Sequence, residues 1–336
     1  MIKSKVVSLI KPYELIFKEK NIDDMHLGDE SILCETLVTI ISPGTEVAAY
    51  TGMPPLRPGN PYPRLLGYCN VARVMKVGSN VSSICVGDRV LTGSCHRSHF
   101  VILENDVFSV VPDAIESRHA ACAYLYHLGY DAVIKSNLRY GNSVVVLGLG
   151  VLGLGAVATA FRAGAKVYAV SDQPVPSEIA KQLGARDVFR RENFKTLENL
   201  LGNRLSDNVI STSNSWEDWD LALKIAGRNS CIGVIGFPGR GQSPPENNPL
   251  DSQYIYDKQL KIKAVGHAPE ENDTRKFLKF NQKDNLSFIL SEIEHGHLNP
   301  ELIISGMFNW DKLEDAYKGL ISRENSPITY GLEWKK

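Results

Sequence analysis

No two cysteines of the chain stand close enough to form a local metal or redox pair. The six cysteines are at least ten positions apart, so neither CxxC zinc knuckles nor a dense disulfide framework is expected. Six scattered thiols in 336 residues fit a reducing compartment, and we expect a cytoplasmic protein. The N-terminal apolar stretches are broken by lysines every few positions, so no signal-peptide core is expected there.

An excess of charge of either sign is also absent. The 37 basic and 38 acidic side chains give a formal net charge of −1, which disfavours nucleic acid or an anionic membrane as partner and leaves small molecules. One stretch, residues 143–161, carries no charge for nineteen residues and is similar in this respect to a membrane span. Because it holds four glycines directly after a β-branched run, a strand, a turn and a helix are favoured instead.

The chain is long enough for two domains, each with its own core. Up to about residue 120, short β-type runs alternate with turns rich in Gly, Pro, Asn and Asp, and helical periodicity is scarce. This pattern predicts a small β-rich domain with strands in the runs SILCETLVTIIS, CNVARVMKVG, DRVLTG and HFVILE. Five prolines from Pro54 to Pro63 predict a stiff loop within it, because proline fixes φ and lacks an N–H donor.

From about residue 120 the pattern changes to alternating strands and helices. Such alternation predicts parallel βαβ units in a doubly wound α/β sheet. The predicted strands are 143–147, 166–170, 207–212, 231–236 and 260–265, and the predicted helices are 120–134, 151–163, 177–183 and 219–226. After about residue 268, two helix-like runs (288–295 and 310–320) and a last β-type run, ITYGLEW, follow.

The strongest local pattern is the run VVVLGLGVLG, residues 144–153, a GxGxxG sequence that follows a buried strand and begins a helix. Gly148 permits a tight turn, Gly150 lets a pyrophosphate approach the backbone, and Gly153 lets the helix pack close to the sheet. The free N–H groups and partial positive charge of the helix start attract a diphosphate. Tight packing without a ligand is the alternative. The predicted dinucleotide site comprises Gly148, Leu149, Gly150, Val151, Leu152 and Gly153.

The choice between NAD and NADP depends on the end of the next strand. A ribose-binding residue is expected about twenty positions after the glycines, where Ser171 and Asp172 stand. An acid favours NAD by chelating the ribose hydroxyls, whereas a serine with a nearby cation tolerates a 2′-phosphate. Ser171 takes the expected acidic position and no Arg or Lys lies at 171–180, so the choice stays open with a slight preference for NADP. Thr212, Gly236 and Phe237, at or next to the ends of later strands, complete the predicted cofactor site.

Taken together, these motifs resemble the medium-chain dehydrogenase/reductase superfamily, which includes alcohol dehydrogenases. The resemblance runs over nearly the whole chain and rests on Pro43-Gly44-Thr45-Glu46, Gly67-Tyr68-Cys69, Val77-Gly78, Gly87-Asp88-Arg89-Val90, the glycine turn and Leu183-Gly184-Ala185. It implies a GroES-like β-rich catalytic domain, residues 1–122 and 268–336, with a Rossmann domain inserted at 123–267. It also implies a bound NAD or NADP that exchanges hydride with a small alcohol or carbonyl substrate, and a homodimer.

The sequence departs from the superfamily's pattern at the positions of the zinc ligands. Pro43 stands where zinc-dependent members have a cysteine, Tyr68 where they have a histidine, and Tyr124 near the position of their third ligand. The four-cysteine structural lobe is absent too, because the segment where it would be inserted holds a single cysteine, Cys95. The resemblance therefore points to a zinc-independent branch without a metal site, similar to bacteriochlorophyllide dehydrogenase and related biosynthetic dehydrogenases.

Without a metal, hydrogen-bond donors have to polarise the substrate oxygen. Thr45 stands at the superfamily's proton-relay hydroxyl, and the Tyr68 phenol, protonated at pH 7, can donate to a developing alkoxide. We expect Thr45 and Tyr68 to hold the substrate oxygen and His127 or His99 to support proton exchange. Glu46, next to Thr45, is counted among the catalytic residues.

Each of these side chains also has a purely structural interpretation. Tyr68 could fill the space left by zinc, and Glu46 could be an ion-pair partner. His99 could be a satisfied core or surface histidine, and His127 could pack between domains. A metal held by Cys69 and dispersed histidines is a further alternative.

The sequence favours an NAD(P)-dependent oxidoreductase that interconverts an alcohol and a ketone without zinc, in a biosynthetic pathway. Reduction of a conjugated C=C bond, as in quinone or enone reductases, is the second interpretation, since hydride delivery to an alkene needs less carbonyl polarisation. A nucleotide-binding protein without catalysis is the third.

Overall fold

The computed structural model describes residues 1–56, 59–266 and 277–334. Contacts divide the chain into two compact units, Met1–Tyr124 with Gln282–Lys336, and Leu125–Asn281. We call them the first and the second unit and describe each by itself. Of the two predicted domain boundaries, 122/123 is two residues from this division, and 267/268 falls outside the described residues.

The second unit contains a six-stranded parallel sheet in the order β11-β10-β9-β12-β13-β14. The chain moves outward from β9 in one direction and then in the other, so the sheet is doubly wound and the predicted α/β fold class is confirmed. The strands are β9 (Ser143–Leu147), β10 (Lys166–Val170), β11 (Asp187–Phe189), β12 (Ser206–Ser211), β13 (Ala226–Val234) and β14 (Lys261–Ala264).

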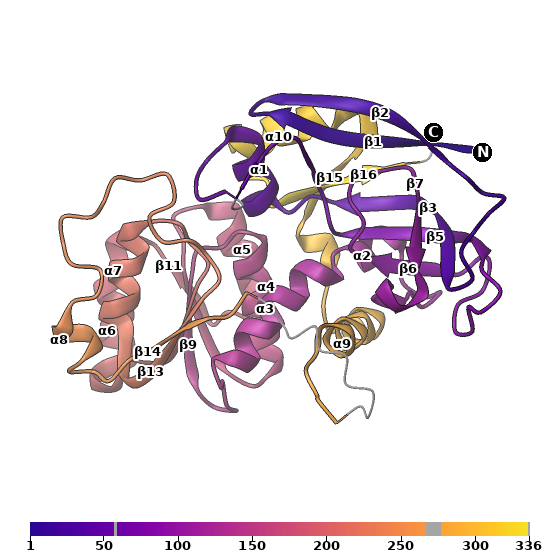
Figure 1. Ribbon diagram of the computed structural model, residues 1–336. Coiled ribbons are helices and arrows are strands. Elements are labelled where there is room, and N and C mark those ends of the chain that lie inside the picture. Colours follow the sequence, from indigo (N-terminus) through magenta and orange to yellow (C-terminus); the bar gives the residue numbers. More distant parts are fainter. Residues whose placement is uncertain (57–58, 267–276, 335–336) are drawn as a thin grey trace. The chain divides into compact units, whose positions relative to one another are not determined.

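Helices cover both faces of this sheet (Figure 1). One of them, α4, packs on β9 and β10, and α7 packs on β9, β12 and β13. Buried residues of the central strands, such as Val145 and Val209, form a core with Leu197 and Trp219. The helices are α3 (Ala123–Lys135), α4 (Val151–Arg162), α5 (Pro174–Gln182), α6 (Phe194–Leu201), α7 (Trp216–Ile225) and α8 (Ser252–Ile255).

The first unit contains two sheets. A three-stranded sheet has the order β2-β1-β4, and a larger sheet has the order β15-β16-β3-β5-β6-β8 with β7 paired to β3. The C-terminal segment completes the larger sheet, because β16 pairs with β3. The strands are β1 (Ile2–Lys11), β2 (Glu14–Ile22), β3 (Ser31–Ile40), β4 (Arg64–Leu65), β5 (Asn70–Val77), β6 (Arg89–Thr92), β7 (His99–Leu103), β8 (Ser109–Val110), β15 (Ile304–Asn309) and β16 (Thr329–Glu333).

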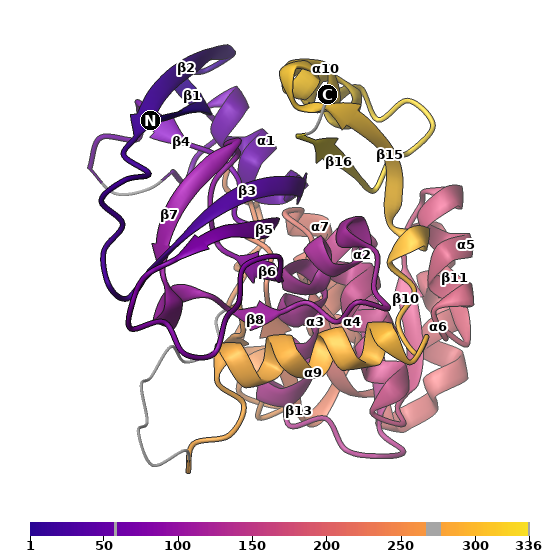
Figure 2. The ribbon, with the colours of Figure 1, turned by 90° about the vertical axis from the view of Figure 1, so that its right-hand side faces the viewer.

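Two helices from opposite ends of the chain meet in the first unit. The N-terminal α1 packs against the C-terminal α10, and α10 also contacts β15 and β16 (Figure 2). A core between them includes Leu9, Tyr50, Tyr317 and Leu332. Helix α1 is therefore packed on the core of the first unit. The helices are α1 (Pro43–Thr51), α2 (Ser117–Ala121), α9 (Gln282–Glu294) and α10 (Leu313–Ser322).

The sequence does not predict β1, β2 or α1. Five consecutive side chains of β2 are exposed and none of its nine is fully buried, so this strand lacks the alternation of a half-buried strand. In α1 the three consecutive residues Ala48, Ala49 and Tyr50 are all buried, so the apolar stripe of an amphipathic helix is missing. The predicted helix 120–134 is split between α2 and α3.

Candidate functional site

The glycine turn joins β9 to α4 in the second unit. Gly148 has φ +87°, in the left-handed region that favours glycine. A Cβ on Gly153 would collide with the backbone oxygen of Gly148, whereas a Cβ on Gly150, the N-cap of α4, would meet no atom within 4 Å. Leu149 and Val151 are buried and contribute to packing. The turn is therefore tight on its protein side and open at Gly150, where a diphosphate could approach the N–H groups of the helix.

Residues at neighbouring strand ends support this turn. Thr212 donates through Oγ1 to the carbonyl oxygen of Gly148 at 2.9 Å. After β13, Gly236 approaches the backbone of Ser213 so closely that a Cβ would collide with its oxygen. The next residue, Phe237, keeps 49% of its surface exposed. All of these residues follow the carboxyl ends of parallel strands, the edge at which doubly wound sheets bind ligands. The residues present thus fit a dinucleotide.

A cation from a later segment, Arg191, lies at the end of β10, although residues 171–180 contain no Lys or Arg. Ser171 is buried, and its Oγ accepts from the N–H of Gln173 at 3.2 Å. The Asp172 carboxylate pairs with the guanidinium of Arg191, which is also held by Asp218 through bonds of 2.7 and 2.9 Å. The bonds to Asp218 raise the pKa of Arg191. Burial opposes ionisation of Asp172, but the contacts with Arg191 outweigh it and lower the pKa of that carboxyl.

In the first unit, Thr45 and Tyr68 come together at the start of α1. Ser42 is the N-cap and Pro43 takes the first helical position, where its missing N–H is harmless. The Tyr68 hydroxyl donates to Ser42 Oγ and lies 3.4 Å from Thr45 Oγ1. We call Ser42, Thr45 and Tyr68 the hydroxyl cluster. Thr45 is exposed and Tyr68 is partly exposed, so the cluster reaches solvent.

Aromatic neighbours hold the Tyr68 ring. It meets Tyr124 edge-on with 5.2 Å between centroids, and Tyr124 meets Phe108 at 5.7 Å. Two positions at which the resemblance implies lost zinc ligands are therefore neighbours in space. Burial raises the pKa of Tyr68, and nearby Cys69 and Glu46 add to the effect. Tyr68 is thus a neutral hydrogen-bond donor at physiological pH.

Glu46 is a buried carboxylate with hydrogen-bond partners on both oxygens. It is 1% exposed, and its Oε1 accepts from the N–H of Ser42 at 2.7 Å. Its Oε2 accepts from the Tyr317 hydroxyl at 2.7 Å and lies 2.7 Å from His96 Nε2. Such partners are what makes a buried carboxylate tolerable. The pairing agrees with the structural interpretation of Glu46. Tyr317, which α10 supplies, has no local signal in the sequence that marks this contact.

The two predicted catalytic histidines have other surroundings. His99 lies on β7 opposite Glu35 of β3, and burial lowers its pKa while Glu35 opposes the shift. His96, three residues earlier, is the histidine that reaches the buried carboxylate. His127 is buried on α3 in the second unit. The structure therefore groups the other three predicted catalytic residues and adds His96 to them.

The donor groups of the described residues do not fit a zinc site. Among residues 1–56, 59–266 and 277–334, no three His, Cys, Asp or Glu side chains are grouped so that they could hold a metal ion. Tyr68 and Tyr124 lack the thiolate and imidazole donors that zinc prefers.

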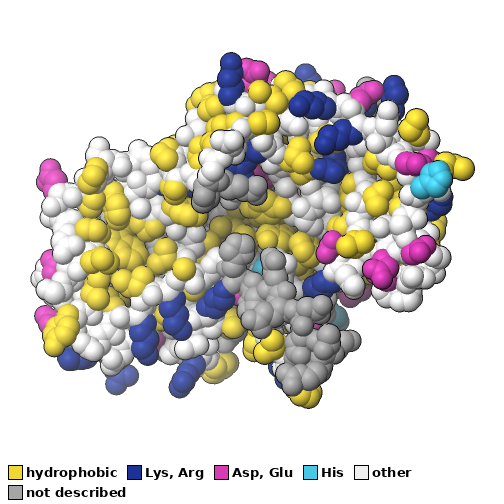
Figure 3. Space-filling model, in the orientation of Figure 1, with side chains coloured by type: hydrophobic (Ala, Val, Ile, Leu, Met, Phe, Trp, Pro, Cys, Tyr) yellow, Lys and Arg dark blue, Asp and Glu magenta, His cyan; other side chains and the backbone are white. Residues whose placement is uncertain are grey.

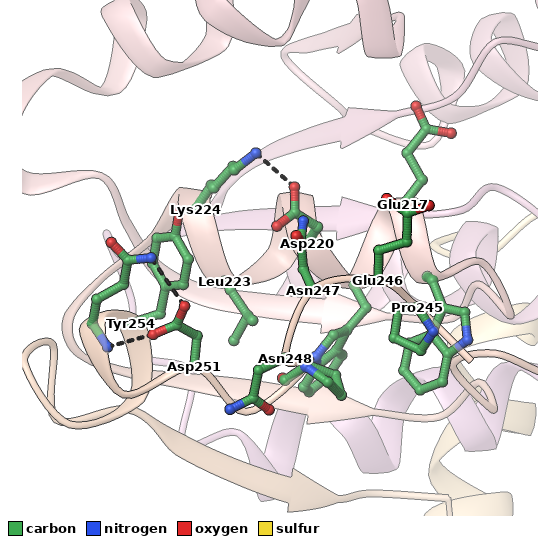
Figure 4. A pocket seen from close by; sticks show the side chains of 14 residues that line it. Glu217, Asp220, Leu223, Lys224, Pro245, Glu246, Asn247, Asn248, Asp251 and Tyr254 are labelled. Carbon is green, nitrogen blue, oxygen red and sulfur yellow. Dashed lines mark hydrogen bonds and ion pairs between the residues drawn. The ribbon is translucent and has the colours of Figure 1, made fainter.

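A hollow of about 680 Å³ lies elsewhere in the second unit, between α7 and the segment 245–254 (Figure 4). Lys224 pairs there with Asp220 at 2.6 Å, and Asp251 accepts from the backbone and side chain of Gln253 at 2.9 and 3.0 Å. These charged groups are satisfied within the protein. None of the predicted site residues lines the hollow, and we assign no role to it.

Acidic and basic side chains are scattered over the face shown in Figure 3, and neither sign forms a continuous field there. The basic stripe typical of nucleic-acid binding is not seen on this face. None of the described helices combines the length and apolar character needed to cross a membrane.

Known proteins resemble the chain over much of its length. The family described as zinc-binding dehydrogenase matches residues 151–283. Sorbitol dehydrogenase of Bacillus subtilis is 23% identical over 237 residues, which cover 60% of this chain and 66%, just under two thirds, of that protein. An uncharacterised zinc-type alcohol dehydrogenase-like protein of Haemophilus influenzae is 23% identical over 321 residues, or 86% of this chain and 90% of that protein.

The fold also has counterparts among solved structures. A protein of Sinorhizobium meliloti 1021, described as a zinc-binding dehydrogenase bound to NADP, aligns with a TM-score of 0.81 and 17% identity. The alignment covers 99% of this chain and 100% of that one. At this identity the likeness concerns the fold alone.

Proposed function

We propose that the chain is an enzyme of the medium-chain dehydrogenase/reductase superfamily, that it interconverts an alcohol and a ketone with NADP or NAD, and that it does so without zinc. The observation that carries the proposal is the glycine turn, closed to side chains at Gly153 and open at Gly150. The hydroxyl cluster of the first unit supports it, because it offers donors to a substrate oxygen.

A bound nicotinamide would supply or accept the hydride. Tyr68 polarises the substrate oxygen, because its raised pKa keeps the phenol protonated beside a developing alkoxide. One donor aimed in this way contributes about 3 kcal/mol to a transition state. Ser42 both accepts and donates, so its hydroxyl can turn toward Tyr68 when the phenol donates to the substrate. The exposed Thr45 is assigned the exchange of the proton with solvent.

Zinc independence is proposed from the donor groups. Pro43 and Tyr68 carry no thiolate or imidazole, and Tyr124 packs on Tyr68 as an aromatic ring. The names of the zinc-type relatives describe those proteins and do not assign zinc to this chain. In this chain, we assign polarisation of the carbonyl to hydroxyl donors. The zinc-independent branch and a biosynthetic role follow as parts of the same proposal.

NADP is proposed as the preferred cofactor. Ser171 stands where an acid would chelate the ribose hydroxyls. Arg191 brings a guanidinium to Asp172 at the end of β10. A 2′-phosphate would compete with Asp172 for this guanidinium, because arginine binds phosphate through paired, charge-assisted hydrogen bonds. A homodimer remains a prediction of the resemblance.

The test is a substrate screen on the purified full chain. Secondary alcohols and polyols are offered with NADP⁺ and NAD⁺, and ketones and enones with NADPH and NADH, while the absorbance of the reduced nicotinamide is followed. We expect oxidation of an alcohol and reduction of the matching ketone, with the higher kcat/KM for NADP. Turnover of enones alone would favour a C=C reductase. Binding of the dinucleotide without any turnover would favour a non-catalytic protein.

A further inference from the structure

The hydroxyl cluster is connected to the buried carboxylate through the backbone of Ser42. The N–H of Ser42 donates to Glu46 Oε1 at 2.7 Å, four residues further along. An N-cap serine ordinarily bonds its side chain to the first N–H groups of the helix. Ser42 makes no such bond, and its Oγ accepts from Tyr68 instead. The Ser42 side chain therefore does not cap α1 and is bonded to the Tyr68 phenol instead.

Glu46 is itself fixed by two other segments. Its Oε2 bonds to Tyr317 of α10 and to His96, each at 2.7 Å. His96 Nδ1 lies 2.8 Å from Thr39 Oγ1, and Trp334 Nε1 donates to the same oxygen at 3.0 Å. The carboxylate thus joins the start of α1 to strands and helices from both ends of the first unit.

The backbone of Tyr68 is tied to the same network. Gly67, directly before it, has φ +89° and lies so close to the His96 ring that a Cβ would be 2.8 Å from it. The N–H of His96 donates to the carbonyl oxygen of Leu66 at 2.8 Å. Tyr68 is therefore held at its hydroxyl through Ser42 and at its backbone through His96. Both Ser42 and His96 are hydrogen-bonded to Glu46.

We propose that Glu46 is the positioning residue of the hydroxyl cluster, bonded to Ser42 and His96 so that the Tyr68 hydroxyl keeps its place. This inference rests on the proposed function, in which Tyr68 acts on the substrate oxygen. Glu46 does not touch the substrate, because it is buried and both of its oxygens bond to protein groups. A glutamine in its place would turn its NH₂ group either toward the Ser42 N–H, which can only donate, or toward the Tyr317 hydroxyl and His96, and the arrangement would shift.

NMR of the full chain tests the positioning without a substrate. Tyrosines are labelled with ¹³C at Cζ, and the signal of Tyr68 is the one lost in Tyr68→Phe. Glu46→Gln is expected to move this signal. Glu314→Gln is the matched control, because it removes a carboxylate near the Tyr50 hydroxyl, at 3.4 Å, on the same unit, and it should leave the signal in place.

A folded Glu46→Gln protein with an unmoved Tyr68 signal overturns the inference. If Glu46→Gln does not fold, Tyr317→Phe takes its place, since it removes one bond to Oε2 and keeps the ring in the core. Tyr317→Phe is then expected to move the Tyr68 signal, and an unmoved signal overturns the inference equally.

Kinetics separate this inference from the proposed function. With the best alcohol of the screen, Glu46→Gln is expected to lower kcat about 10- to 100-fold with the cofactor KM unchanged, because a small displacement of a catalytic group slows the reaction by such factors. In a Tyr68→Phe background the same change should cost no more than about 2-fold, because the two residues act as a unit. An undiminished loss in that background overturns the inference. Full activity of Tyr68→Phe alone removes Tyr68 from the proposed mechanism, whereas absence of alcohol and ketone turnover in the wild-type screen overturns the proposed function; in both cases the NMR result still decides the positioning.

Discussion

Among single residues, Tyr68 is the one to which we assign polarisation of the substrate oxygen. Its phenol lies where the resemblance implies a lost zinc ligand, and it bonds to Ser42 beside Thr45. We predict that Tyr68→Phe lowers kcat/KM about 100- to 1000-fold, the effect of removing one aimed donor, while the Kd of the cofactor is unchanged. Steady-state kinetics and a cofactor titration check this. Tyr13→Phe, at a tyrosine that is 60% exposed, is the control and should act as wild type.

The pH dependence of activity follows from the burial of the same phenol. A free tyrosine loses its proton near pH 10, but burial raises the pKa of Tyr68. The proton therefore stays on at pH 10, and we predict no loss of kcat/KM between about pH 8 and 10 from this group. A decline in that range that disappears in Tyr68→Phe would contradict the assignment.

Single residues differ in how far the sequence can identify them. Thr45, Glu46 and Tyr68 belong to short local motifs, so the sequence alone could select them. His96 and Tyr317 reach the carboxylate only through the pairing of distant segments, and nothing near them in the sequence marks that role. A local pattern shows which residues are neighbours along the chain, whereas these contacts depend on the tertiary fold.

Among the elements of the fold, the turn between β9 and α4 has two glycines with different roles. Gly153 is needed for packing, and Gly150 is the one that we assign to diphosphate binding. Gly150→Ala adds a methyl group to open space at a φ of −73°, so stability should stay within about 1 kcal/mol of wild type. The cofactor Kd should rise at least about tenfold, because the methyl stands where a diphosphate has to approach. Thermal unfolding and a cofactor titration measure the two effects.

Gly153→Ala is the contrasting variant of the same turn. Its methyl would collide with the backbone oxygen of Gly148, so unfolding should become easier by about 1 to 3 kcal/mol. If instead Gly150→Ala were the destabilised variant, or if it bound the dinucleotide as tightly as wild type, the turn would not be the diphosphate site.

The edge after β10 should set the choice of cofactor. We predict that Asp172→Asn improves the Kd of NADP⁺ several-fold relative to that of NAD⁺, because it removes the carboxylate that competes for Arg191. Glu217→Gln is the matched control, since Glu217 lies 3.8 Å from the same guanidinium and is exposed. An unchanged ratio of the two Kd values in Asp172→Asn would mean that Arg191 does not meet the 2′-phosphate.

The elements themselves were predicted unevenly, for physical reasons. The bounds of β9 and β10 are as predicted, because each is a short, mostly apolar run that begins two residues after a glycine. Strand β2 and helix α1 are not predicted by the sequence, since neither has a one-sided apolar pattern. The cation at the end of β10 is not predicted by the sequence because Arg191 follows the next strand, β11. It lies near the end of β10 only because the two strands pair in parallel.

In the molecule as a whole, the chain divides its tasks between two units. The second unit has the glycine turn, and the first has the hydroxyl cluster beside Glu46, which bonds to Ser42 and to Tyr317 from the other end of the chain. Alternating strands and helices made the second unit predictable. The joining of α1 to α10 depends on contacts between residues more than 250 positions apart, which no local pattern encodes.

Turnover by protein depleted of zinc tests the central claim most directly. The full chain is treated with a chelator, its zinc content is measured by elemental mass spectrometry, and kcat for the best alcohol with NADP⁺ is compared with that of untreated and zinc-supplemented protein. If hydroxyl groups polarise the substrate, kcat is the same in all three preparations. Loss of activity on depletion, with recovery when zinc is returned, would contradict the account.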